Sequence, residues 1–176
     1  NCFGTIDQVK PISLSFLRSL LQKRVPERVN FINAETVAKE LGIDVSFNYS
    51  TSDSNYSNLI SAKVVSEDEN IFEGSVFNDD LPRLVNLMGY KMEVNLIGTL
   101  LFIKNDDVPG VIGKVGSLLG DNSINIGAYL LSQNSEKSLA FAVIRLDSPI
   151  SLELISQLQS IEEVKFVNQI EINKSY

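Results

Sequence analysis

The chain has 176 residues, of which 44% are hydrophobic and 21% are charged. It lacks histidine, which removes the commonest general base and the commonest metal ligand, and its one cysteine, Cys2, excludes an internal disulfide. The net charge of −7 disfavours a nucleic-acid partner, because phosphates are neutralised by basic side chains. We therefore expect one ordinary domain or two small ones, with no catalytic residue and no metal site.

No apolar run approaches the roughly 20 residues that span a bilayer. The first five residues carry neither the basic region nor the apolar core of a signal peptide. These features predict a cytoplasmic protein without a membrane partner. Because Asn1 is not an initiator methionine, we expect the chain to be a piece of a longer protein.

The first half predicts two helices and a small, largely antiparallel sheet. A helix is expected over residues 11–24, and a second is expected from Asn33, whose side chain can cap it, to Gly42. The polar residues 45–58 are typical of a loop. The strands expected after this loop span residues 59–66, 71–77, 83–87 and 91–94, and the last two are expected to form a hairpin.

The second half predicts the order β-α-β-β-α-β of the ferredoxin-like arrangement. Residues 99–104 form an apolar run, which indicates a strand buried on both faces or paired in an oligomer. The later elements are expected at residues 111–120 (helix), 124–132 and 138–147 (strands joined by a polar turn at 133–137), 151–161 (helix) and 164–172 (strand). The fold class is therefore α+β, with two small α/β-sandwich domains at residues 1–96 and 97–176.

The turn between the first strand and first helix of this second half has the chemistry of an amino-acid site. Free backbone N–H groups near Val111 and Ile112 lie at the positive pole of the helix and suit a carboxylate. Asp107 and the amide of Asn105 lie beside them and suit an ammonium, with Asn125 in reach if another chain packs alongside. In a purely structural alternative, Asp107 complements the helix dipole and Asn105 bonds its own backbone.

Residues 105–126 resemble an ACT domain, a small module that binds amino acids and regulates enzymes. Residues 27–43, 56–60, 72–75 and 82–85 resemble, in that order, the allosteric substrate-binding domain that precedes ACT in D-3-phosphoglycerate dehydrogenases. The resemblance covers nearly the whole chain after residue 8. It implies a regulatory region with no active site of its own, in which L-serine or another small amino acid binds between two ACT domains.

The resemblance also implies site residues. Asn105 and Asp107 match effector positions in the turn, and Asn125 is contributed by the partner chain. The complete candidate effector site comprises Asn105, Asp107, Val108, Pro109, Gly110, Val111, Ile112 and Asn125. A second site for a small anionic effector is implied at Arg83 and Arg145, where the alternative is that both make surface ion pairs.

We expect the parent to be an NAD-dependent oxidoreductase that catalyses the first step of L-serine biosynthesis, with NAD bound outside this chain. The chain itself is expected to mediate homo-oligomerisation as a dimer or a tetramer. Two alternatives remain: the corresponding domains of an iron-sulfur L-serine dehydratase subunit, and a stand-alone amino-acid sensor.

Overall fold

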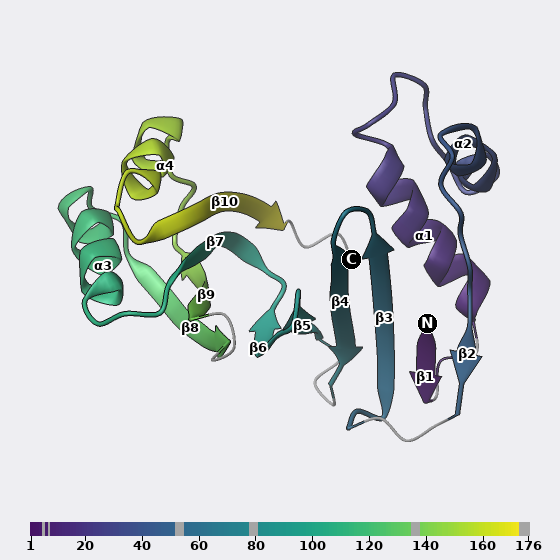
Figure 1. Ribbon diagram of the computed structural model, residues 1–176, viewed down its shortest axis with the longest axis horizontal. Coiled ribbons are helices and arrows are strands. Elements are labelled where there is room, and N and C mark those ends of the chain that lie inside the picture. The colour runs from purple at the N-terminus through teal and green to yellow at the C-terminus, as the bar shows by residue number, and fades with distance from the viewer. Residues whose placement is uncertain (5, 7, 52–54, 78–80, 135–137, 173–176) are drawn as a thin grey trace. The chain divides into compact units, whose positions relative to one another are not determined.

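The computed structural model describes residues 1–4, 6, 8–51, 55–77, 81–134 and 138–172 (Figure 1). They form two compact units, residues 1–62 and 63–176. The helices are α1 (Val9–Leu21), α2 (Ala34–Glu40), α3 (Val111–Asp121) and α4 (Leu152–Gln159). The strands are β1 (Cys2–Gly4), β2 (Tyr49–Ser50), β3 (Asn58–Val65), β4 (Glu69–Val76), β5 (Pro82–Leu87), β6 (Tyr90–Asn95), β7 (Gly98–Asp106), β8 (Ile126–Asn134), β9 (Leu139–Leu146) and β10 (Val164–Ile172). The predicted α+β class is confirmed, whereas the domain limits 1–96 and 97–176 stay a prediction.

In the first unit, α1 and α2 pack through a small aliphatic core. Leu17 and Leu21 of α1 contact Val37 and Ala38 of α2 in one buried cluster. The α2 helix begins after Asn33, as predicted, but the Asn33 side chain does not cap it. Its Oδ1 instead accepts from the backbone N–H of Asn30 at 2.7 Å, which stabilises the preceding turn.

The strands of the first unit centre on β1, which the sequence did not predict. β1 pairs with β2 in parallel and with β3 in antiparallel orientation. β2 is a two-residue strand inside the stretch expected to be a loop, residues 45–58, of which 52–54 lie outside the described residues. Cys2 in β1 is 2% exposed, and burial raises the pKa of its thiol. Its burial places it in the core of this unit.

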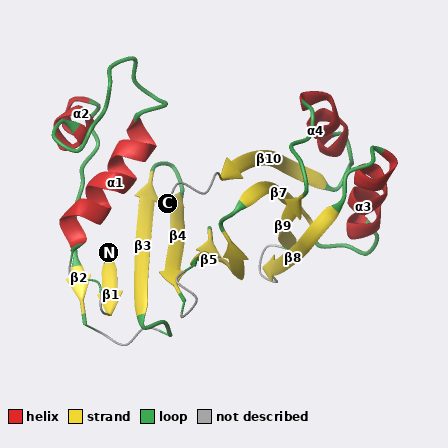
Figure 2. Cartoon of the chain, turned by 180° about the vertical axis from the view of Figure 1, so that it is seen from behind, coloured by secondary structure: helices red, strands yellow, loops and turns green. Residues whose placement is uncertain are grey.

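In the second unit, β7 to β10 and the two later helices follow the predicted order β-α-β-β-α-β (Figure 2). The sheet has the strand order β10-β7-β9-β8, so β7 and β9 are central while β8 and β10 are edges. Ser151 begins α4 as predicted, since its Oγ accepts the N–H of Leu154 at 3.2 Å. The preceding strands β4, β5 and β6 form an antiparallel meander, which confirms the predicted hairpin between β5 and β6.

Both faces of this four-stranded sheet are covered. Leu101 and Ile103 of β7 pack against α3 and α4 on one face. Leu100 and Phe102, the alternate residues, pack against side chains of β5 and β6 on the other. Of the two explanations for the apolar run 99–104, burial on both faces is therefore confirmed. The cover provided by the meander also explains why β4 to β6 belong to the second compact unit.

Two predicted strand limits were wrong where polar residues continue a strand. Asn105 and Asp106 belong to β7 instead of the following turn, because they pair with Ala140 and Leu139 of β9. β8 runs over Ile126–Asn134, so Asn125 precedes this strand. Of the turn expected at residues 133–137, residues 135–137 lie outside the described residues.

Candidate functional site

The candidate site lies where the central strand β7 ends and α3 begins. Gly110 is the N-cap of α3 with φ of 96°, a left-handed conformation that a glycine adopts without steric cost. The first N–H groups of this eleven-residue helix therefore lie at the turn that follows β7. Of the predicted site residues here, Val111 is buried, while Val108, Pro109, Gly110 and Ile112 are exposed.

Backbone hydrogen bonds hold this turn on two sides. The N–H of Asp106 donates to the carbonyl of Glu163 at 2.8 Å, which ties the turn to the segment before β10. The N–H of Asp107 donates to the carbonyl of Ser138 at 3.0 Å, which ties it to the start of β9. The turn is thus positioned by segments distant in sequence.

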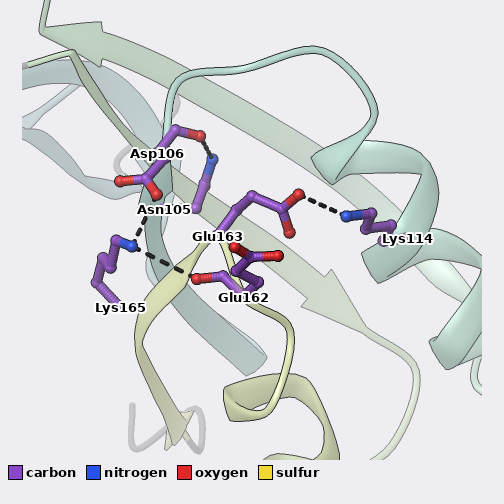
Figure 3. A network of polar contacts seen from close by, with 6 residues as sticks. All are labelled: Asn105, Asp106, Lys114, Glu162, Glu163 and Lys165. Atoms are coloured by element: carbon purple, nitrogen blue, oxygen red, sulfur yellow. Dashed lines mark hydrogen bonds and ion pairs between the residues drawn. The ribbon is translucent and has the colours of Figure 1, made fainter.

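A polar network flanks the turn on the β10 side (Figure 3). Lys114 of α3 pairs with Glu163, and Lys165 of β10 pairs with Asp106 at 2.7 Å. The hydrogen bond from Lys114 lowers the pKa of the Glu163 carboxyl below its usual value. Both carboxylates are therefore compensated by a lysine.

Asn105 is 4% exposed, and its amide is used locally. Its Nδ2 donates to the backbone carbonyl of Asp106 at 2.7 Å (Figure 3). One of the two N–H donors of this amide is thus used inside the chain, as the structural alternative for Asn105 expected, and its Oδ1 is an acceptor that suits an ammonium.

Asp107 has a different partner, which the sequence analysis missed. Nε2 of Gln133 in β8 donates to Oδ1 of the half-buried Asp107 at 2.9 Å. In β8, Tyr129, Leu131 and Gln133 lie opposite Ile144, Ala142 and Ala140 of β9, so they share the helix-covered face. Gln133 continues the alternation of Tyr129 and Leu131, and this pattern is the sequence signal that places it on the same face of a strand. The prediction of a turn at residues 133–137 hid that signal.

Asn125 lies at the opposite end of the sheet in the same chain. Asp106, next to Asp107, pairs with Leu139 at the start of β9, and Ile126, next to Asn125, pairs with Leu146 at its end. The length of this eight-residue strand, about 25 Å, therefore separates Asp107 from Asn125. The Nδ2 of Asn125 donates to Oδ2 of Asp147 at 2.7 Å. One chain therefore does not bring Asn125 to Asp107.

The two arginines of the expected anion site have different surroundings. Arg83 donates from Nε to Oδ1 of Asn95 at 2.7 Å, and its guanidinium lies 4.2 Å from the ring centre of Phe77. Arg145 donates to the carbonyl of Gly127 at 3.3 Å. Arg83 is thus held within the meander, whereas Arg145 of β9 is held by a carbonyl at the start of β8.

Comparisons with known proteins identify the relatives of this chain. Residues 4–88 match the family of the D-3-phosphoglycerate dehydrogenase intervening domain. The chain is 31% identical over 172 residues, 96% of its length, to the D-3-phosphoglycerate dehydrogenase of Bacillus subtilis. The chain resembles one part of D-3-phosphoglycerate dehydrogenase. The enzyme of Synechocystis is 28% identical over 89% of the chain, and that of Methanocaldococcus jannaschii is 30% identical over 92%.

The chain spans about a third of the length of the D-3-phosphoglycerate dehydrogenases it matches. It covers 33% of the Bacillus subtilis enzyme, 28% of the Synechocystis enzyme and 30% of the Methanocaldococcus jannaschii enzyme. Among the residues that the structure describes, no helix combines the length and the apolar character needed to cross a bilayer.

Proposed function

We propose that this chain is the regulatory part of a D-3-phosphoglycerate dehydrogenase and binds L-serine as an allosteric effector. Residues 97–176 act as an ACT domain in this proposal, and the preceding residues as the allosteric substrate-binding domain. The names of the relatives support the dehydrogenase over the iron-sulfur dehydratase and the stand-alone sensor.

The observation that carries the proposal is the position of Asp107 beside the start of α3. A zwitterionic amino acid needs a negative group for its ammonium and donors for its carboxylate. Asp107 is the negative group, and the first backbone N–H groups of α3, at Val111 and Ile112, are the donors. Asn105 adds its Oδ1 as an acceptor.

The edge strand β8 gives a route for Asn125 to reach this site. In an antiparallel pairing of two β8 strands about their midpoint, the start of each strand lies beside the end of the other. Asn125, just before β8 in one copy, is then brought toward the Gln133 end of β8 in the second. Homodimerisation through β8 thus completes two equivalent sites, and it covers an edge that otherwise invites aggregation.

In the parent enzyme, we propose that oxidation with NAD occurs outside this chain, in the cytoplasm. Glycines 110, 113 and 116 do not form a dinucleotide loop, because Gly110 caps α3 and the other two lie within it. Serine acts by binding one arrangement of the oligomer, dimer or tetramer, more tightly than the other, since equal binding shifts nothing.

A small anionic effector is a separate proposal that rests on Arg83 and Arg145. Arg83 is oriented by the amide of Asn95, and a guanidinium recognises a carboxylate or phosphate through paired hydrogen bonds. 3-Phosphoglycerate is the probe that tests this site. Binding that Arg83→Gln and Arg145→Gln leave unchanged contradicts it.

Calorimetric titration with L-serine tests the effector site. We expect wild-type chain to bind L-serine and Asp107→Ala to bind it roughly 10- to 100-fold more weakly, the loss expected for a charge-assisted hydrogen bond. Asp121→Ala, which removes an exposed acid at the other end of α3, is the matched control and leaves affinity unchanged. Equal binding by wild type and Asp107→Ala contradicts the role of Asp107.

A further inference from the structure

Three of the carboxylates around the turn after β7 are held in different ways. Asp106 is paired with Lys165 at 2.7 Å, and Glu163 is paired with Lys114. Asp107 instead accepts a hydrogen bond from the amide of Gln133 at 2.9 Å. Within the described part of the chain, no lysine or arginine pairs with Asp107.

The direction of this hydrogen bond is fixed by its chemistry. An ionised carboxylate only accepts hydrogen bonds, so the amide nitrogen of Gln133 must be the donor. A neutral donor orients the Asp107 carboxylate without compensating its charge, whereas a lysine would both orient the carboxylate and compensate its charge. Among the residues that the structure describes, the charges of Asp106 and Glu163 are therefore compensated by lysines, whereas the charge of Asp107 is not.

We propose that Gln133 is a positioning residue that makes this site selective for ligands with an ammonium group. The proposal rests on the effector site described above. Gln133 holds one oxygen of Asp107, Oδ1, and leaves the other oxygen and the full negative charge to the ligand. The site then accepts α-amino acids and discriminates against 2-hydroxy acids of the same shape, which present a neutral hydroxyl to the same carboxylate.

The decisive variant is Gln133→Lys, because it preserves the hydrogen bond to Asp107 while compensating its charge. The probes are L-serine and L-glycerate, which differ in having an ammonium or a hydroxyl on the α-carbon. We expect Gln133→Lys to weaken L-serine binding roughly 10- to 100-fold and to leave L-glycerate binding unchanged or stronger. A merely structural role predicts no loss, since the lysine still donates to Asp107.

One further variant separates the positioning of Asp107 from the compensation of its charge, and two variants are controls. Gln133→Met removes the donor and leaves the charge, and we expect it to weaken L-serine by about 3- to 10-fold while keeping the preference for serine over glycerate. Gln157→Lys adds the same charge on the exposed surface of α4 and controls for net charge; neither affinity should change. Lys137→Gln removes the lysine nearest to Gln133 in sequence and should also leave both affinities unchanged.

The outcomes separate this inference from the function on which it rests. If wild-type chain binds neither probe, the effector site and this inference both fail. If wild type binds L-serine and Gln133→Lys binds it equally well, with the same ratio to L-glycerate, only the role of Gln133 is overturned. A stronger affinity for serine in Lys137→Gln overturns it too, since Asp107 was then already compensated. Thermal denaturation of each variant confirms that the unit is folded.

Discussion

The two faces of the four-stranded sheet are built in different ways. The face under α3 and α4 is aliphatic, and it is covered by helices that connect the strands of the sheet itself. The opposite face carries Phe141, whose ring centre lies 5.4 Å from that of the meander residue Tyr90 and 6.4 Å from that of Phe102. One face is thus closed by local connections and the other by an upstream segment. With both faces occupied, the edges remain for pairing with another chain.

Truncation to residues 97–176, which removes the meander from one face of the sheet, should have the largest effect on stability. The truncated chain retains the helix-covered face and exposes Leu100, Phe102, Phe141 and Val143 on the other. We expect it to bind a hydrophobic dye and aggregate, because an exposed apolar patch of this kind promotes association. Residues 63–176, which keep the meander, are the control and should give a cooperative thermal transition. Equal stability of the two would show that the meander is not needed.

Phe141→Ala tests the aromatic face in the complete chain. The Phe141 side chain is 1% exposed, and its removal should lower the free energy of unfolding by about 3–5 kcal/mol. Phe166→Ala on β10 is the matched control, since Phe166 is 43% exposed, and should change it by about 0.5 kcal/mol or less. Urea denaturation measures both. Similar losses for the two variants would be inconsistent with a packed core on this face.

Tyr90→Phe, on the aromatic face, should increase the stability of the protein. The hydroxyl of Tyr90 is buried and has no hydrogen-bond partner among the described residues, and burial raises its pKa. Removing an unsatisfied buried hydroxyl should raise the free energy of unfolding by about 1 kcal/mol. Tyr49→Phe is the opposite control and should lower stability, because it removes the hydrogen bond that the Tyr49 hydroxyl donates to the Gly4 carbonyl at 2.9 Å. A loss in Tyr90→Phe would reveal a partner for its hydroxyl.

The smallest predicted effect concerns the helix-covered side and depends on pH. Because Lys114 lowers the pKa of Glu163, this carboxylate stabilises the fold above its unfolded pKa, about 4.5. The contribution is lost as pH falls through the lower folded value. Glu163→Gln should therefore reduce stability near pH 7 and flatten its fall between pH 5 and 3. The urea midpoint measured across this range tests the sign, and parallel curves would contradict it.

The sequence predicted what local patterns determine. The order of elements in the second unit followed from alternation in strands and from residues such as Ser151, whose hydroxyl caps the next helix. Asn105 and Asp106 were misplaced in a turn because polar residues disfavour strands, while their membership of β7 depends on pairing with distant residues.

The same limit applies to the candidate site. Asp107 and the start of α3 were predicted from adjacent residues. The contact between Asp107 and Gln133 was not predicted, since 26 positions separate these residues in the chain. The meander cover of β7 was equally hidden, because an apolar run alone does not tell which segment buries it.

The hydrogen bond between the Asp106 N–H and the Glu163 carbonyl has a consequence for the order of folding. β7 is paired along its length with β10, and Lys114 meets Glu163 across 49 positions of sequence. During synthesis, the turn after β7 emerges well before the segment that ties it in place. Helix α3 can form early, but the turn acquires its final shape only when β10 has been translated and has added to the sheet. A ribosome paused before β10 therefore carries a nascent chain in which the turn after β7 is not yet held in place.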